Sequence, residues 1–207
     1  MTPRDPIELI PPARLAKTSV MALDPGDEAG GLCVIDVDPT TGRPGVRWVL
    51  SYAGRSARLW SPGQPLITTS SGCLLGLLQI APPFVGELVC EQLKPFRGFN
   101  KGFRVLVEAA GGVKHWARAR GCVISPAEPD PGRWRADVLH IRPGTPADTC
   151  AAAAVAAVEG RPVPGSRYDL RLGLREPVRP IDEHGAEAVC IGLWALGYRA
   201  TVSGGGR

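Results

Sequence analysis

The first third of the chain alternates short apolar runs with turn residues, which is the pattern of β-strands joined by tight turns. The apolar runs 18–24 and 30–38 are separated by a Pro-Gly turn, and a third run, 43–54, follows the turn at 39–42. Pro, Gly, Asp and Thr at these points favour reversal of the chain. The pattern therefore predicts three antiparallel strands in succession.

Two further strands and several helices are predicted after this meander. The runs 86–92 and 121–127 are short and apolar, as expected of strands buried on both faces. Helical patterns cover about 101–120, the alanine-rich run 147–160 and the segment 182–200, which Asp182 caps. A short helix is also expected within 68–83, before Pro82. We expect an α/β fold with a five-stranded mixed sheet flanked by helices.

The domain organisation follows from the length and from the two ends. A chain of 207 residues fits one domain with a well-covered core. Residues 1–18 are Pro-rich and aperiodic, which indicates an N-terminal arm, whereas 201–207 form a Gly-rich tail that we expect to be flexible. The Pro- and Arg-rich segment 161–180 has no firm period and is interpreted as a loop with a short ordered piece. The domain itself is placed at 19–200.

Composition is that of an ordinary soluble globular protein, with 44% hydrophobic and 21% charged residues. Apolar stretches end well short of the about 20 residues that a membrane span needs. The N-terminal segment lacks the apolar core of a signal peptide. The six cysteines show no C-x-x-C spacing, which favours reduced, structural thiols. These features predict a cytoplasmic protein without a membrane partner.

Positive charge is concentrated in one segment, although the net charge is only +4. Between Lys94 and Arg120 there are seven Lys and Arg residues and a single acid, Glu108. Phe96, Phe99 and other aromatic residues are interleaved with them. Such a segment is typical of a surface that meets the phosphates of a nucleic acid. The alternative is a solvated helix face in an arginine-rich chain.

Candidate chemistry lies where predicted strands end. Asp24 and Glu91 each close an apolar run, and the ends of neighbouring strands in an α/β sheet are where sites form. His184 and Glu187 are three residues apart, on one face of the last helix. Carboxylates and an imidazole suit Mg²⁺ or Mn²⁺, and two such ions can cut a phosphodiester. The structural alternatives are a turn acceptor at Asp24, a strand-end carboxylate at Glu91, a capping histidine and a solvated helix acid.

These segments carry a resemblance to a known family. "ALDPGDEAGGLCVID", "LVCEQ", "PFRGFNKGFRVLVEAAGGV" and "EHGAEAVCIGLWAL" are similar, in order and in approximate spacing, to the motifs of the RuvC-type Holliday junction resolvases. These are crossover junction endodeoxyribonucleases of the RNase H-like superfamily. The similarity extends over about residues 19–198.

The resemblance implies an RNase H-like nuclease domain and a homodimer that cuts four-way DNA junctions symmetrically. It implies Mg²⁺ or Mn²⁺, with two ions per active site. Asp24, Glu91, His184 and Glu187 take the catalytic and metal-binding positions. The residues expected to contact DNA are Lys94, Phe96, Arg97, Phe99, Asn100, Lys101, Arg104, Arg133 and Arg135.

Three departures from the family pattern matter. Glu187 stands where the family usually has the shorter aspartate, and Glu183, one helical turn earlier, is a rival ligand. The segment "GTPADTC" lacks the family's lysine, so its phosphate-contacting role passes to Arg133, Arg135 or Arg142. The acids Asp27, Glu28 and Asp182 lie near the expected site and are unusual neighbours.

Two other function classes remain as alternatives. One is a catalytically silent protein that binds branched DNA, in which Glu187 has disabled the metal site. The other is a fragment of an actin-like or sugar-kinase-like ATPase, which would need a second similar domain and a second glycine-rich phosphate loop. The sequence contains no G-x-S-x-G and no phosphate-binding G-x-x-x-x-G-K-[ST], which argues against hydrolase triads and P-loop chemistry.

Overall fold

The computed structural model describes residues 5–10, 17–26, 28–54, 56–70, 78–79, 81–94, 101–163 and 168–202. Within these ranges the strands are β1 (Asp5–Ile10), β2 (Ser19–Asp24), β3 (Ala29–Val37), β4 (Pro44–Ala53), β5 (Ser56–Trp60), β6 (Ile67–Ser70), β7 (Glu87–Cys90), β8 (Val123–Ile124), β9 (Tyr168–Arg171) and β10 (Arg199–Val202). The helices are α2 (Lys101–Ala119), α3 (Pro131–Leu139), α4 (Ala147–Val158) and α5 (Glu183–Ala195).

The main sheet has the strand order β6-β5-β4-β3-β2-β7-β8. From β2 to β6 the neighbours are antiparallel, whereas β7 and β8 join parallel to β2. An α/β fold with a mixed sheet flanked by helices is therefore confirmed. The five predicted strands are β2, β3, β4, β7 and β8, but the sheet has seven strands, because β5 and β6 extend it beyond β4. Both are short, and their partly exposed residues give no continuous apolar run.

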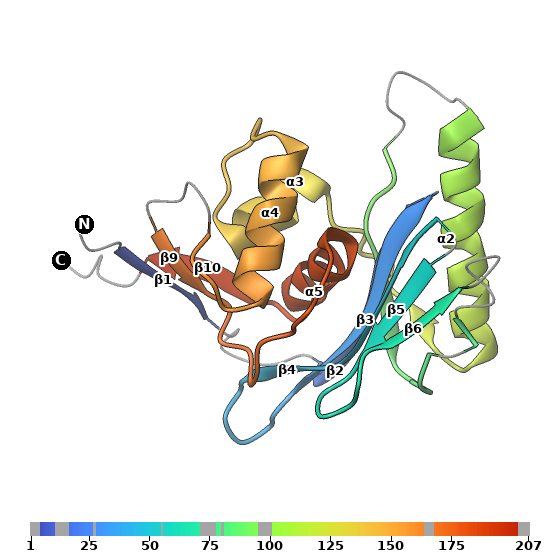
Figure 1. Ribbon diagram of the computed structural model, residues 1–207, viewed down its shortest axis with the longest axis horizontal. Coiled ribbons are helices and arrows are strands. Elements are labelled where there is room, and N and C mark those ends of the chain that lie inside the picture. The colour runs from blue at the N-terminus through green and yellow to red at the C-terminus, as the bar shows by residue number, and fades with distance from the viewer. Residues whose placement is uncertain are drawn as a thin grey trace.

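A second, three-stranded sheet has the order β10-β1-β9. Strand β1 pairs antiparallel with β10 and parallel with β9, so Ile7 lies opposite both Val202 and Leu170. The segment expected to be an arm thus contains a strand, and the ordered piece expected in 161–180 is β9. Each strand depends on partners far away in the sequence. In Figure 1 this sheet lies beyond α4 and α5, away from the main sheet.

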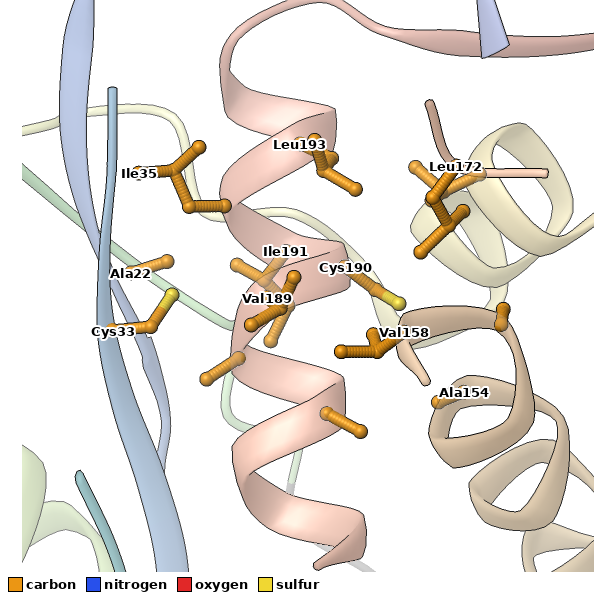
Figure 2. Packing of buried hydrophobic residues seen from close by; sticks show 14 of the residues in the cluster. Ala22, Cys33, Ile35, Ala154, Val158, Leu172, Val189, Cys190, Ile191 and Leu193 are labelled. Carbon is orange, nitrogen blue, oxygen red and sulfur yellow. The ribbon is translucent and has the colours of Figure 1, made fainter. Parts of the chain in front are cut away.

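Helices cover both faces of the main sheet. Helix α2 lies on one face, and α3, α4 and α5 lie on the other (Figure 1). Neighbouring residues of β2 illustrate the division, because Met21 packs on the α2 side and Ala22 on the α5 side. Figure 2 shows α5 between the strands that carry Ala22 and Ile35 and the helix that carries Ala154. The apolar character of β2 and β3 follows from this burial on two faces.

The helix predictions are largely confirmed. Helices α2 and α4 match the predicted segments, and Asp182 is the N-cap of α5 as expected. Helix α5 ends earlier than predicted, because β10 occupies the end of the segment predicted as helix and the first two residues of the segment predicted as a tail. Helix α3 was not predicted. The helix expected within 68–83 falls mostly outside the described residues, and β6 occupies the start of that range. The described cysteines are buried and unpaired, namely Cys33, Cys90, Cys122, Cys150 and Cys190.

Among the described helices, none combines the length and the apolar character needed to cross a membrane.

Candidate metal centre

The two acids predicted at strand ends meet at one edge of the main sheet. Strands β2 and β7 are parallel neighbours, with Leu23 opposite Cys90. Asp24 is the last residue of β2, and Glu91 follows β7 directly. The backbone N–H of Glu91 donates to the carbonyl of Leu23 at 3.0 Å and continues the pairing by one residue. The topology therefore places both carboxylates at adjacent strand ends.

Helix α5 begins at the same edge and is anchored there through its N-cap. The Asp182 carboxylate accepts a hydrogen bond from the backbone N–H of Gly185 at 2.9 Å. The other carboxylate oxygen accepts from Ser51 Oγ of β4 at 2.5 Å. This side-chain cap satisfies a free N–H of the first turn and fixes the helix to the sheet. It directs His184 and Glu187 toward the strand ends.

Asp24, His184 and Glu187 form a compact group. His184 Nδ1 is 2.9 Å from Asp24 Oδ2. One candidate ligand atom from each of the three residues lies within 4.8 Å of the other two. Asp24 and Glu187 are buried, so Glu187 is not a solvated helix acid. Glu183 stays outside the group with its side chain 57% exposed, 3.5 Å from His184 Nε2.

Glu91 and Glu187 are each held by a residue of α3. Trp134 Nε1 donates to Glu91 Oε1 at 2.5 Å, and Arg135 Nη2 donates to Glu187 Oε1 at 2.7 Å. Two consecutive residues of one helix thus contact two of the carboxylates. Glu91 does not belong to the Asp24, His184 and Glu187 group found among the described residues.

Burial and mutual repulsion make this cluster electrostatically unfavourable for ionised carboxylates. Burial raises the pKa of Asp24, and burial together with the charge of Asp24 raises the pKa of Glu91 to about 8 and also raises that of Glu187. The hydrogen bond to Asp24 raises the pKa of His184. A divalent cation would relieve the repulsion and favour the ionised forms. The oxygen and imidazole donors present fit Mg²⁺ or Mn²⁺.

A cavity of about 650 Å³ opens beside the cluster. Small or apolar residues make up half of its lining, and charged or polar residues make up the other half, namely Asp148, Arg161, Asp182, Glu183 and His184. The small side chains leave one flank of His184 open. Of the cluster residues, His184 lines this cavity and Asp24, Glu91 and Glu187 do not, so the cavity gives a ligand access to the imidazole.

The residues expected to contact DNA are distributed unevenly. Phe96, Arg97, Phe99 and Asn100 lie outside the described residues, and Lys101 begins α2. Lys94 pairs with Asp130, Arg104 pairs with Glu108, and Arg133 is 3.9 Å from Asp137. Arg135 lies within the cluster on Glu187.

Trp134 and Ser51 were missed as contributors to the site. Asp130 followed by Pro131 is a helix-start signal, and Asp130 does cap α3 through the backbone N–H of Arg133. That signal could have predicted the helix. It could not have revealed the hydrogen bond from Trp134 to Glu91, because the two residues are 43 positions apart.

Comparisons with known proteins give a structural likeness only. No protein-family model and no curated protein matches the chain. The structure of Thermus thermophilus RuvC in complex with a Holliday junction substrate matches with a TM-score of 0.45 and 18% identity, covering 88% of this chain and 99% of that one. A second Thermus thermophilus RuvC structure matches with the same TM-score and coverage at 19% identity. At such identities the likeness concerns the fold alone.

Proposed function

We propose that this protein is a metal-dependent endodeoxyribonuclease that resolves four-way DNA junctions as a homodimer. The observation that carries the proposal is the buried group of Asp24, His184 and Glu187, with ligand atoms within 4.8 Å of one another. Glu91 lies at the adjacent strand end, held by Trp134. The order of the sequence motifs described above supports a branched DNA substrate rather than another phosphodiester.

Asp24, His184 and Glu187 would hold the Mg²⁺ or Mn²⁺ ion. When bound, the ion supplies a Lewis acid that activates water and stabilises the leaving oxygen of a phosphodiester. Asp24 orients the imidazole of His184 through Nδ1, and the Asp182 cap fixes the first turn of α5. Trp134 orients the Glu91 carboxylate beside them. These contacts position the donor atoms before DNA arrives.

The decisive experiment compares a synthetic four-way junction with a linear duplex of the same sequence, with Mg²⁺, with Mn²⁺ and without metal. We expect metal-dependent, symmetrically placed nicks in the junction only. Asp24→Asn is expected to reduce cutting by at least about 100-fold, because loss of a residue that only supports a metal ligand already costs about 10–100-fold in activity. Junction binding should survive. Glu176→Gln is the matched control, because it makes the same acid-to-amide change at an exposed residue near Asp36, at the opposite end of β2 from Asp24, and it should keep activity.

Junction binding without cutting in either metal would support the silent branched-DNA-binding alternative and contradict the nuclease. Near wild-type cutting by Asp24→Asn would contradict the assignment of the site. Equal cutting of junction and duplex would support nuclease activity but contradict the proposed specificity for four-way junctions.

A further inference from the structure

The candidate metal centre contains a fixed positive charge as well as its carboxylates. Arg135 Nη2 lies 2.7 Å from Glu187 Oε1, and the two side chains are only 24% and 11% exposed. A guanidinium keeps its charge throughout the usual pH range, and it forms directional bonds to carboxylates. The centre therefore has one permanent cation of its own.

Helix α3 keeps this guanidinium beside Glu187. Arg135 Cζ is 5.1 Å from the ring centroid of Trp134, whose side chain is completely buried. Val138 and Leu139 bury the next turn of the helix, and Asp130 caps its first turn. Arg135 therefore lies on a packed element and close to the carboxylates.

The charge of the centre limits how many metal ions it favours. With Asp24, Glu91 and Glu187 ionised, His184 neutral as a metal ligand and Arg135 present, the net charge of these five side chains is minus two, and the charge of nearby Glu183 is screened because that side chain is exposed to solvent. One divalent ion neutralises this charge. A second ion would leave a buried centre with an excess positive charge, which desolvation disfavours. Glu91, which lies outside the compact ligand group, is already held by Trp134.

We propose that Arg135 takes the place of a second metal ion, so that each chain binds a single divalent ion. Asp24, His184 and Glu187 are the residues that would hold it. This inference rests on the function proposed above and replaces the two ions implied by the sequence resemblance. Arg135 thereby becomes part of the charge balance of the centre instead of an ordinary DNA contact.

The test counts bound Mn²⁺ by electron paramagnetic resonance and by calorimetry, on protein alone and on protein with a four-way junction. The junction carries phosphorothioate linkages at its crossover to slow cutting, and the Mn²⁺ bound by junction alone is subtracted. Wild type, Arg135→Gln, the charge-keeping Arg135→Lys and Arg133→Gln are compared. Arg133 is a neighbour on α3 with its side chain 71% exposed, so its substitution removes the same charge outside the cluster.

We expect one Mn²⁺ per chain for wild type, Arg135→Lys and Arg133→Gln, with or without the junction. Arg135→Gln should bind a second Mn²⁺, because the positive charge that disfavours a second ion is gone. Two ions on wild type would overturn the inference, even if Arg135→Gln failed to fold. A folded Arg135→Gln that still binds a single Mn²⁺ would also overturn it, whatever its affinity. The count of bound ions does not depend on cutting. A protein that binds one Mn²⁺ per chain but cuts no junction would therefore contradict the proposed function and leave this inference standing.

Discussion

Gly31 of β3 lies directly against the backbone of His184 at the start of α5. A Cβ atom on Gly31 would be 2.1 Å from the carbonyl oxygen of His184 and 2.9 Å from the amide nitrogen of Gly185. Gly31 is also the register partner of Asp24 in the β2–β3 pair. The absence of a side chain at this position therefore lets α5 approach closely enough for His184 Nδ1 to lie 2.9 Å from Asp24.

Gly31→Ala should displace the first turn of α5. We expect a loss of about 1–3 kcal/mol in the free energy of unfolding, the usual cost of overpacking. Junction cutting should fall by roughly 100-fold, the cost of a misplacement of about 1 Å. Urea unfolding and single-turnover cleavage measure the two effects.

Gly111→Ala in α2 is the matched control, because a Cβ there meets no atom within 4 Å. It should stabilise the helix by about 0.5–1 kcal/mol and leave cutting unchanged. If Gly31→Ala behaved in the same way, the close approach of β3 and α5 would not position the site.

Trp134→Phe should disturb Glu91 through the loss of one hydrogen bond. The bond from Trp134 lowers the pKa of Glu91 against the larger effect of burial, so its removal should raise that pKa above about 8. A bound divalent ion lowers the pKa of Glu91 in both proteins, but the acidic limb of the pH–rate profile for cutting should still lie at higher pH in Trp134→Phe than in wild type. We expect the rate at pH 7.5 to fall by about 10–100-fold, the range for loss of a group that orients a metal-site residue.

Trp48→Phe separates this effect from simple loss of ring volume. Trp48 is also fully buried, and its indole nitrogen has no hydrogen-bond partner among the described residues. Both substitutions should lower the free energy of unfolding, but only Trp134→Phe should change the pH profile. The same pH shift in both variants would show that Trp134 acts through packing alone.

Glu91→Gln should stabilise the metal-free protein at alkaline pH. Burial and the charge of Asp24 raise the pKa of Glu91 to about 8 in the folded chain, whereas an unfolded Glu titrates near about 4.3. Between these values the folded state binds more protons, so the stability contribution of Glu91 is lost as pH rises toward 8. With EDTA at pH 8.5, we expect a Tm increase of at least about 2–4 °C, the shift that 1 kcal/mol produces in a chain of this size.

The gain should shrink at pH 5, where folded Glu91 keeps its proton. Glu183→Gln, which removes an exposed carboxylate from α5, should change Tm little at either pH. An equal Tm change at pH 5 and pH 8.5 for Glu91→Gln would contradict the raised pKa of this carboxyl.

The parts of the fold that the sequence predicted are those with strong local patterns. Strands β2, β3 and β7 are apolar because helices cover both sheet faces, and α5 combines an N-cap with a dense apolar segment. Strands β1, β9 and β10 show no such pattern, because their stability depends on pairing with one another across most of the chain. Helix α3 carries few buried residues and therefore a weak period.

The same reasoning explains what could be predicted of the candidate site. Asp24 and Glu91 were found because a carboxylate at the end of an apolar run is conspicuous, and His184 because its spacing to Glu187 is local. Arg135 was expected at a DNA phosphate but pairs with Glu187, 52 positions away. No local pattern indicates such a tertiary contact, which depends on where α3 packs.

The two ends of α2 should contribute differently to DNA binding. Helix α2 has 19 residues and so is about 28 Å long. It follows β7, whose end carries Glu91, and it leads back to β8, which runs parallel to β7. Arg104 therefore lies toward the end of the sheet that holds the candidate site, and exposed Arg118 lies toward the opposite end.

If the junction binds over the site, Arg104→Gln should weaken binding and reduce the slope of log K against log salt by about 1, because one phosphate contact is lost. Arg118→Gln removes the same charge at the far end and should leave the slope unchanged. Wild-type binding should fall steeply as salt rises. Fluorescence anisotropy with a labelled four-way junction over about 50–200 mM salt, without divalent metal, measures all three slopes. Equal effects of the two substitutions would indicate that α2 contributes only overall charge, and a flat wild-type slope would exclude a phosphate-contacting surface.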